Sequence, residues 1–273
     1  MVRKIILELK DFDNLYYEVC NEPYFGDTLA LREWENQMTA IVVDAEKDFS
    51  QKHLISNNVA NGFLKVPEPR EGVSIYNFHH AKPPVTVAMN YNLNKVVGDN
   101  ETGFNGIEDA TYRTEAWDFI MAGGALFNHL DYSFTTDNED GSFKIETGQP
   151  GGGGKTLRKQ FKILADFMQS LNYISMRPVN TEIVRLKGEK KMPIYGLYEE
   201  GKVLAMHLCG KDTASAGTLI DINLPTGTYT LTWIDTKSAA ETASSLNKHS
   251  GGWTTIASPP YIGDVALRVV KLN

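Results

Sequence analysis

The chain has little cysteine, no cluster of positive charge and no long apolar run. Its 273 residues include only Cys20 and Cys209, too few for a disulfide framework or a thiolate metal site. The net charge is −7 and no Lys/Arg-rich block is present, which argues against a nucleic-acid partner. No apolar stretch could span a bilayer, and the first ten residues lack the apolar core of a secretory signal. A neutral or weakly charged partner fits this composition best.

The sequence is that of a globular protein, and its pattern of apolar and polar residues differs between two regions. Apolar residues make up 42% of it, enough for one large domain or two smaller ones. Up to residue 177, strand-like and helix-like runs alternate, which is typical of a parallel sheet covered by helices. From residue 178, short alternating runs between turn signals predict an antiparallel β-sandwich. We therefore expect an α/β domain over residues 1–177 and a β-sandwich over 178–273.

The first of these regions holds fewer units than a complete barrel. The expected strands are 15–20, 53–58, 73–79, 95–101 and 126–134. Helices are expected at 34–49, 109–123 and 156–171, where apolar residues recur every three or four positions. Residues 2–10 resemble the end of a further helix. A (β/α)8 TIM barrel needs eight strands and about 250 residues, so the sequence predicts a partial barrel that lacks three units, in a chain that starts inside a longer protein.

Two carboxylates follow strand-like runs at corresponding places. Asn21-Glu22-Pro23 comes directly after the run 15–20, and Glu101 ends the run that starts at Val96. Barrels place their reacting groups at the carboxyl ends of strands, and glycoside hydrolysis needs two carboxyl groups beside the scissile bond. Asp99 lies on the same side of its strand as Glu101, because strand side chains alternate with a period of two. The sequence thus predicts a glycosidase with Glu22 and either Glu101 or Asp99 as its acidic pair.

Further polar residues lie at or near the expected strand ends and are candidates for contacts with sugar hydroxyls. They are Asn21, Tyr24, Asn57, His79, His80, Asp99, Asp131 and Tyr132. Loop capping explains several of them nearly as well. Aromatic stacking would fall to Tyr24, Phe25, Phe104 or Tyr132. The histidines have no third ligand at a metal-binding spacing, so neither a metal nor another cofactor is expected.

The motif Asn21-Glu22-Pro23, with Glu101-Thr102-Gly103 at a later strand end, resembles the clan A retaining glycoside hydrolases, of which the family 5 cellulases are the best known. Residues 12–18, 112–117 and 130–134 look like the apiosidase-like barrel proteins. Those proteins commonly end in a small β-sandwich named for collagen binding, and residues 179–273 look like it. The likeness covers nearly the whole chain.

This resemblance implies roles and strand numbers. Glu22 would be the acid/base at the end of strand 4, Glu101 would be the nucleophile at the end of strand 7, and strands 1 to 3 would precede Met1. Asn21 would hydrogen-bond the sugar 2-hydroxyl. Many clan A enzymes carry a tryptophan after strand 8, where this sequence has Leu130-Asp131-Tyr132. We expect Trp34 and Trp117 in the core instead, because both lie in helix-like runs.

The alternative function is a carbohydrate-binding or scaffold module without catalysis, since the missing strands would supply part of the pocket. The chain alone could then be inactive. Trp233 and Trp253 of the predicted sandwich could form a sugar-stacking face, or could lie in its core or an interface. We expect a carbohydrate substrate, no nucleic acid and no membrane span. The complete protein is expected to be secreted or periplasmic, although this chain contains no signal peptide.

Overall fold

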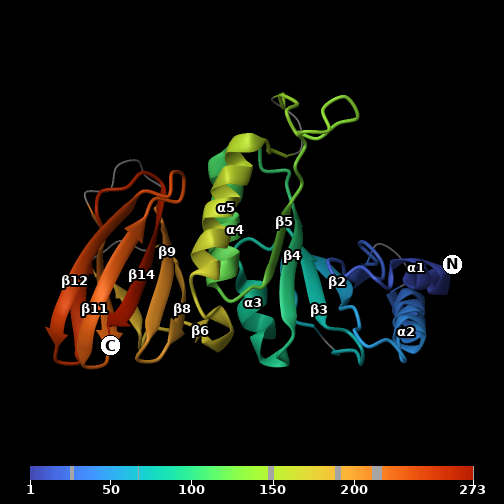
Figure 1. Ribbon diagram of the computed structural model, residues 1–273, viewed down its shortest axis with the longest axis horizontal. Coiled ribbons are helices and arrows are strands. Elements are labelled where there is room, and N and C mark those ends of the chain that lie inside the picture. The colour runs from blue at the N-terminus through green and yellow to red at the C-terminus, as the bar shows by residue number, and fades with distance from the viewer. Residues whose placement is uncertain (25–27, 67, 147–150, 188–191, 211–216, 273) are drawn as a thin grey trace. The chain divides into compact units, whose positions relative to one another are not determined.

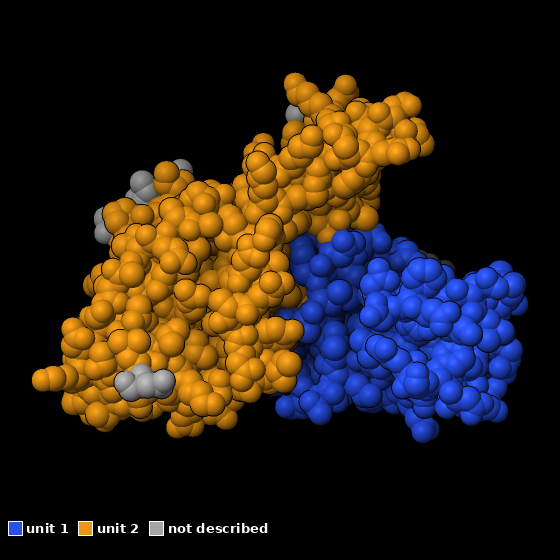
Figure 2. Space-filling model, viewed as in Figure 1, with its two compact units in different colours: residues 1–102, 124–128 blue, residues 103–123, 129–273 orange. Residues whose placement is uncertain are grey.

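The computed structural model describes residues 1–24, 28–66, 68–146, 151–187, 192–210 and 217–272 (Figure 1). Contacts divide the chain into two compact units (Figure 2). The first comprises Met1–Thr102 and Gly124–Asn128, and the second comprises Gly103–Gly123 and His129–Asn273. Helices α4 (Asp109–Met121) and α5 (Lys155–Gln169) are therefore grouped with the C-terminal sheets. The division after residue 177 stays a prediction.

The first unit is built on a five-stranded sheet whose strands follow one another in chain order. They are β1 (Tyr17–Glu18), β2 (Ile55–Asn61), β3 (Ile75–His79), β4 (Val96–Thr102) and β5 (Leu126–His129). The pairs β1–β2, β2–β3 and β3–β4 are parallel, and Ile75 lies opposite both Ser56 and Val96. This curled sheet agrees with a partial TIM-like barrel. All five expected strands are present.

Helices α1 (Val2–Leu9) and α2 (Thr28–Ala45) also belong to the first unit, in which Ile6, Val42 and Ile55 share a small core. Trp34, which was expected in the core, is 40% exposed. The expected apolar positions Ala45 and Phe49 pack against this core. The fully buried positions on α2 and directly after it are Glu35, Thr39, Val42 and Glu46. Both glutamates are buried because each has partners: Glu35 accepts from Arg70 and Asn57, and Glu46 accepts from His53.

Two other local expectations differ from the structure. A short helix, α3 (Val85–Asn90), and the 3-10 turn η1 (Tyr91–Leu93) follow β3 and were not predicted. Strand β5 ends at His129 rather than at residue 134, because the Asp131 carboxylate accepts hydrogen bonds from the backbone and hydroxyl of Ser133 and forms a turn. No helix within the described residues is long and apolar enough to cross a membrane.

The second unit contains two antiparallel sheets and the short turn η2 (Tyr173–Ser175). One sheet has the order β13 (Gly252–Ala257), β10 (Leu219–Leu224), β7 (Val184–Leu186). The other has the order β12 (Glu241–His249), β11 (Gly227–Ile234), β14 (Asp264–Leu272), β9 (Val203–Cys209), β8 (Ile194–Glu199), β6 (Arg177–Pro178). Alternate residues of both sheets, such as Ile222 and Leu267, form one shared core.

Helix α4 contacts strands β8 and β9. Four charged side chains, called here the ionic quartet, join α4 to β9 and β14: Arg113, Asp118, His207 and Asp264, of which all but Asp118 are buried. Arg113 Nη2 donates to Asp264 Oδ1 at 2.6 Å. The His207 ring nitrogens lie 2.8 Å from Asp118 Oδ1 and 3.3 Å from Asp264 Oδ2. Trp117 stacks on His207 with ring centres 5.4 Å apart. Two positive and two negative groups thus balance each other, and only Asp118 is partly exposed to water.

The ionic quartet shifts the proton equilibria of its members. Burial alone would lower the pKa of His207, but hydrogen bonds to Asp118 and Asp264 raise it to about 9. Burial would likewise raise the pKa of Asp264, but the hydrogen bonds from His207 and Arg113 hold it well below its usual range. Both shifts favour the charged forms, so His207 is an imidazolium that donates from both nitrogens.

Asp264→Asn should destabilise the second unit by about 3–5 kcal/mol, because it leaves Arg113 and His207 buried without their counter-charge. Urea unfolding followed by tryptophan fluorescence would measure this, since Trp117 stacks on His207. Asp166→Asn is the matched control, because Asp166 pairs with Lys162 on the exposed side of α5 and should cost no more than about 0.5 kcal/mol. Equal effects of the two substitutions would contradict the role given to the ionic quartet.

Stability should also fall at alkaline pH. The pKa of His207 is about 9 in the folded chain against an ordinary value of 6.5. Its contribution is therefore complete below about pH 6.5 and is lost as the pH rises through 9, by up to about 3 kcal/mol. The measurement is the unfolding free energy between pH 6.5 and 9.5. A flat profile over that range would show that His207 is not held as an imidazolium.

Candidate functional site

Glu22 follows β1 and has an unusual backbone conformation. Its φ is +48°, a left-handed value that residues other than glycine seldom adopt. The Glu22 backbone N–H donates to Asn58 Oδ1 at 3.0 Å, which ties this turn to the next strand, β2. A strained conformation held by a specific side-chain contact is a common feature of functional sites.

Glu101 is brought to the same place by the register of the sheet. It lies on β4 opposite His79 of β3, and the pairing shifts by one residue between Phe78 and His79. The His80 N–H donates to the Glu101 carbonyl at 2.9 Å and holds the two strand ends together. Such irregularities turn a side chain in a new direction, and here the shift leaves Asp99 and Glu101 in different surroundings.

His79 lies between the two glutamates. Its Nδ1 is 3.1 Å from Glu22 Oε1 and 3.7 Å from Glu101 Oε2, and its side chain is fully buried. The three ligand atoms of Glu22, His79 and Glu101 all lie within 4.8 Å of one another. Two carboxylates from strand ends far apart in the sequence therefore meet at one imidazole nitrogen.

The surroundings of His79 decide which nitrogen carries its proton. Nε2 is buried and has no hydrogen-bond partner among the described residues. Nδ1 faces two carboxylate oxygens, which can only accept while they are ionised. A proton on Nδ1 satisfies this contact, so we assign the Nδ1–H tautomer.

The Tyr24 side chain lies beside that of Glu22. Its hydroxyl lies 3.3 Å from Glu22 Oε1 and donates to Asn61 Oδ1 at 2.7 Å. Burial, together with the nearby carboxylates of Glu22, Glu101 and Glu18, raises the pKa of Tyr24. The phenol therefore stays protonated and acts as a hydrogen-bond donor within a negatively charged site.

Glu18 ends strand β1 and was not singled out from the sequence. Its carboxylate accepts from Ser56 Oγ at 2.9 Å, from Asn77 Nδ2 at 2.6 Å and from Asn100 Nδ2 at 3.0 Å. Gly98 makes room for this group, since an added Cβ there would lie 2.0 Å from Asn77 Oδ1. The available signal was a carboxylate inside an otherwise apolar run. Three neutral donors thus hold this half-buried carboxylate in place.

The structure separates the two candidates for the second carboxylate. Asp99 is 2% exposed, and its Oδ2 accepts the backbone N–H of Ala81 at 3.1 Å, so it ties the loop after β3 to the sheet. The side chain of Glu101 is 26% exposed and faces His79. A substrate could reach Glu101 but not Asp99. This geometry supports Glu101 as the partner of Glu22.

The other expected contact residues are distributed as follows. Asn21 is exposed beside Glu22, whereas Asn57 is buried and donates to Glu35 of α2 at 3.2 Å. His80 is half-buried with φ +54°. Asp131 and Tyr132 belong to the second unit, where Asp131 accepts from Arg158 Nη1 at 2.6 Å. Phe104, also in that unit, is exposed, and Phe25 lies outside the described residues.

The trio Glu22, His79 and Glu101 could also hold a metal ion. It offers two carboxylate oxygens and one imidazole nitrogen, donors that suit zinc and similar divalent ions. The sequence alone did not suggest this set, because its members are far apart in the chain and follow no metal-binding spacing. Three ligands with an open side could bind an ion, but the same arrangement serves acid/base chemistry.

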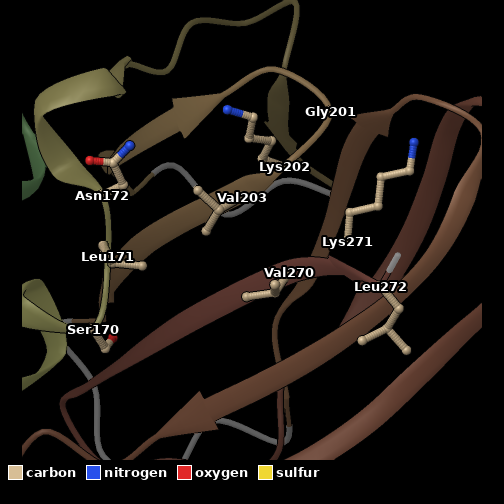
Figure 3. Close-up of a pocket in the computed structure, with 9 residues that line it drawn as sticks. All are labelled: Ser170, Leu171, Asn172, Gly201, Lys202, Val203, Val270, Lys271 and Leu272. Carbon is tan, nitrogen blue, oxygen red and sulfur yellow. The ribbon is translucent and has the colours of Figure 1, made fainter.

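Two pockets help to delimit the site. One of about 250 Å³ is lined by Tyr24, Asn58 and residues of α2 and the loop after β2. Another of about 560 Å³ lies in the second unit between the loop after α5 and strands β9 and β14 (Figure 3). Its Lys202 and Lys271 side chains extend apart, and none of its lining residues is acidic or aromatic. Of these two pockets, only the first is lined by residues that contact Glu22, namely Tyr24 and Asn58.

Comparisons with known proteins show what this fold resembles. No family model and no curated protein matches the sequence. A solved structure titled "Glycoside hydrolase" is similar with a TM-score of 0.67 and 14% identity, over 99% of this chain and 67% of that one. A glycoside hydrolase of family 5 from Bacteroides vulgatus ATCC 8482 gives a TM-score of 0.68 and 13% identity, over 99% and 65%. A GH30 endoxylanase from Clostridium papyrosolvens C71 gives 0.51 and 12%, over 99% and 69%.

At these identities the likeness concerns the fold. The chain spans about two thirds of the length of the three structures. The expected resemblance to glycoside hydrolases is confirmed at this coarse level, and the closer likeness to apiosidase-like proteins and their collagen-binding domain stays a prediction. The barrel-like sheet and the antiparallel sheets both lie within the matched region.

The tautomer of His79 can be measured. Nitrogen-15 NMR of the imidazole rings should show His79 protonated at Nδ1 and unprotonated at Nε2, because only Nδ1 faces acceptors. His249 is an internal control with the opposite expectation, since its Nε2 faces the carbonyls of Leu224 and Gly252. A proton on Nε2 of His79 would mean that the imidazole does not donate to the glutamates.

Proposed function

We propose that this chain carries the catalytic pair of a retaining glycoside hydrolase that acts on an oligo- or polysaccharide. The observation that carries the proposal is the meeting of Glu22 and Glu101 oxygens within 4.8 Å of each other at His79 Nδ1. Retaining enzymes place their two carboxyl groups about 5–5.5 Å apart, whereas inverting enzymes need about 6.5–9.5 Å for an intervening water. The short gap favours the retaining mechanism.

In the proposed reaction, Glu22 carries a proton on Oε2, which leaves Oε1 as the acceptor for His79 Nδ1–H. The Glu101 carboxylate attacks the anomeric carbon while the Glu22 carboxylic acid gives this proton to the leaving oxygen. The glycosidic bond breaks, and an ester joins the sugar to Glu101. Water then attacks the same carbon, Glu22 takes the proton of that water, and Glu101 leaves as a carboxylate. Both groups return to their first state, so no cofactor is consumed.

The neighbouring residues have supporting roles in this proposal. His79 Nδ1–H holds the two carboxylates at a fixed separation, and the Tyr24 hydroxyl orients Glu22. Asn21 is assigned to the sugar 2-hydroxyl, and His80 is assigned to an outer hydroxyl contact. The sugar contacts expected of Asp131 and Tyr132 stay predictions from the sequence, because both residues belong to the second unit. Asn57 and Asp99 support the site through Glu35 and Ala81 rather than by touching the sugar.

The numbering of the strands is part of the same proposal. Glu22 follows β1 and Glu101 lies on β4, three strands further on, as strands 4 and 7 of a barrel would require. The five strands would then be strands 4 to 8, and the two antiparallel sheets would form the accessory β-sandwich. A non-catalytic carbohydrate-binding module is the alternative, and the kinetic test below decides between them.

Glu22→Gln and Glu101→Gln should each lower turnover by at least about 10³-fold, because each removes one half of the double displacement. Aryl glycosides and oligosaccharides serve as substrates, for the chain itself and for any upstream extension that the gene encodes. Glu33→Gln is the matched control, because Glu33 is exposed on α2 and should leave turnover unchanged.

Reaction with azide distinguishes the nucleophile from the acid/base residue. With an activated aryl glycoside, Glu101→Gly plus azide should yield a glycosyl azide of inverted configuration, because azide replaces the nucleophile in one displacement. Glu22→Gly plus azide should yield the retained configuration, because azide then attacks the glycosyl ester on Glu101. Exchanged products would reverse the assignment. Wild-type turnover in both glutamine variants, or hydrolysis with inversion, would overturn the proposed function.

A further inference from the structure

The three-stranded sheet of the second unit has one buried face and one solvent face. Ile220, Ile222 and Ile256 point into the shared core, as the alternation of β10 and β13 requires. The alternate residues point outward, and they are unlike an ordinary sheet surface. They include Arg185 on β7, Asp221 and Asn223 on β10, and Trp253 and Thr255 on β13.

Trp253 is the main feature of this solvent face. It is 41% exposed, whereas Trp233 of the six-stranded sheet is only 4% exposed. The Arg185 guanidinium carbon lies 4.1 Å from the centre of its ring. The ring is therefore held in place by a cation–π contact while much of its surface remains open to solvent. A large exposed aromatic residue held in this way is suited to stacking against a ligand.

The polar neighbours of Trp253 are held in place as well. Thr255 Oγ donates to Asp221 Oδ1 at 2.6 Å, and Lys187 Nζ donates to Thr255 Oγ at 3.1 Å. Asn223 lies directly opposite Trp253 in the register of β10 and β13. An aromatic ring thus lies beside a carboxylate, an amide and a hydroxyl on one sheet surface. These groups can hydrogen-bond hydroxyls that are arranged along an extended ligand.

We propose that this sheet face, formed by Arg185, Asp221, Asn223, Trp253 and Thr255, binds the pyranose units of a glycan. The apolar C–H face of a pyranose would stack on the Trp253 ring, and its hydroxyls would bond Asp221, Asn223 and Thr255. The choice of a glycan rests on the proposed function, but none of these residues belongs to the proposed catalytic group. The face would keep a polysaccharide attached while other parts of it are cleaved.

Native affinity electrophoresis tests this proposal on the full chain. The gels contain a neutral β-glucan, a mannan, a xylan or polygalacturonate, so that neutral and uronic-acid pyranoses are compared. A Glu22→Gln background protects the gel matrix from cleavage. At least one polysaccharide should retard the chain, and Trp253→Ala should weaken that binding by at least about 10-fold. Trp253→Phe should keep part of it, because an aromatic ring remains.

Tyr173→Ala is the matched control, because Tyr173 is an exposed aromatic residue of the same unit outside this sheet face, on η2. It should leave retardation unchanged, and circular dichroism checks that each variant is folded. Unchanged retardation of Trp253→Ala, equal loss in Tyr173→Ala, or no retardation in any gel would overturn the proposal. Failure of the catalytic tests with normal retardation would reject only the glycosidase, so the two proposals fail separately.

Discussion

The first unit depends on one contact, the position of His79 Nδ1 between Glu22 and Glu101. Two carboxylates this close repel each other unless a donor lies between them. The imidazole is positioned by burial and by the register shift between β3 and β4, and its Nε2 has no competing partner among the residues that the structure describes. The turn at Glu22 completes the arrangement, with the Tyr24 hydroxyl 3.3 Å from Glu22 Oε1. The site is thus built from strand ends.

The second unit uses charge in a different way. In the ionic quartet every charge has a partner, and three of its four groups are buried at the contact of α4 with the six-stranded sheet. On the three-stranded sheet, Arg185 and Trp253 pair at the surface, where water remains in contact with both. Breaking a buried pair leaves a charge without a partner and destabilises the contact, whereas an exposed pair leaves its groups available to a ligand. The second unit therefore contains one charged contact that fixes its structure, the ionic quartet, and one that a ligand can reach, the Arg185–Trp253 pair.

Much of the fold was predictable from residue patterns, because the alternation of strand-like and helix-like runs and the motifs at strand ends can be read from neighbouring residues. The order of the strands in the first sheet and the meeting of Glu22 with Glu101 followed from them. The buried face of α2 was not predictable, since Glu35 and Glu46 occupy core positions through partners distant in sequence. The hydrogen bonds to Glu18 and the position of His79 between Glu22 and Glu101 were missed for the same reason. Partners of buried polar groups become visible only in three dimensions.

Gly98 shows how a residue without a side chain can govern chemistry elsewhere. A methyl group at that point of β4 would displace the Asn77 amide, and Asn77 is the nearest donor to Glu18. The Glu18 carboxylate would then lose one of its three donors. A side chain at position 98 should therefore be tolerated only together with a smaller residue at position 77.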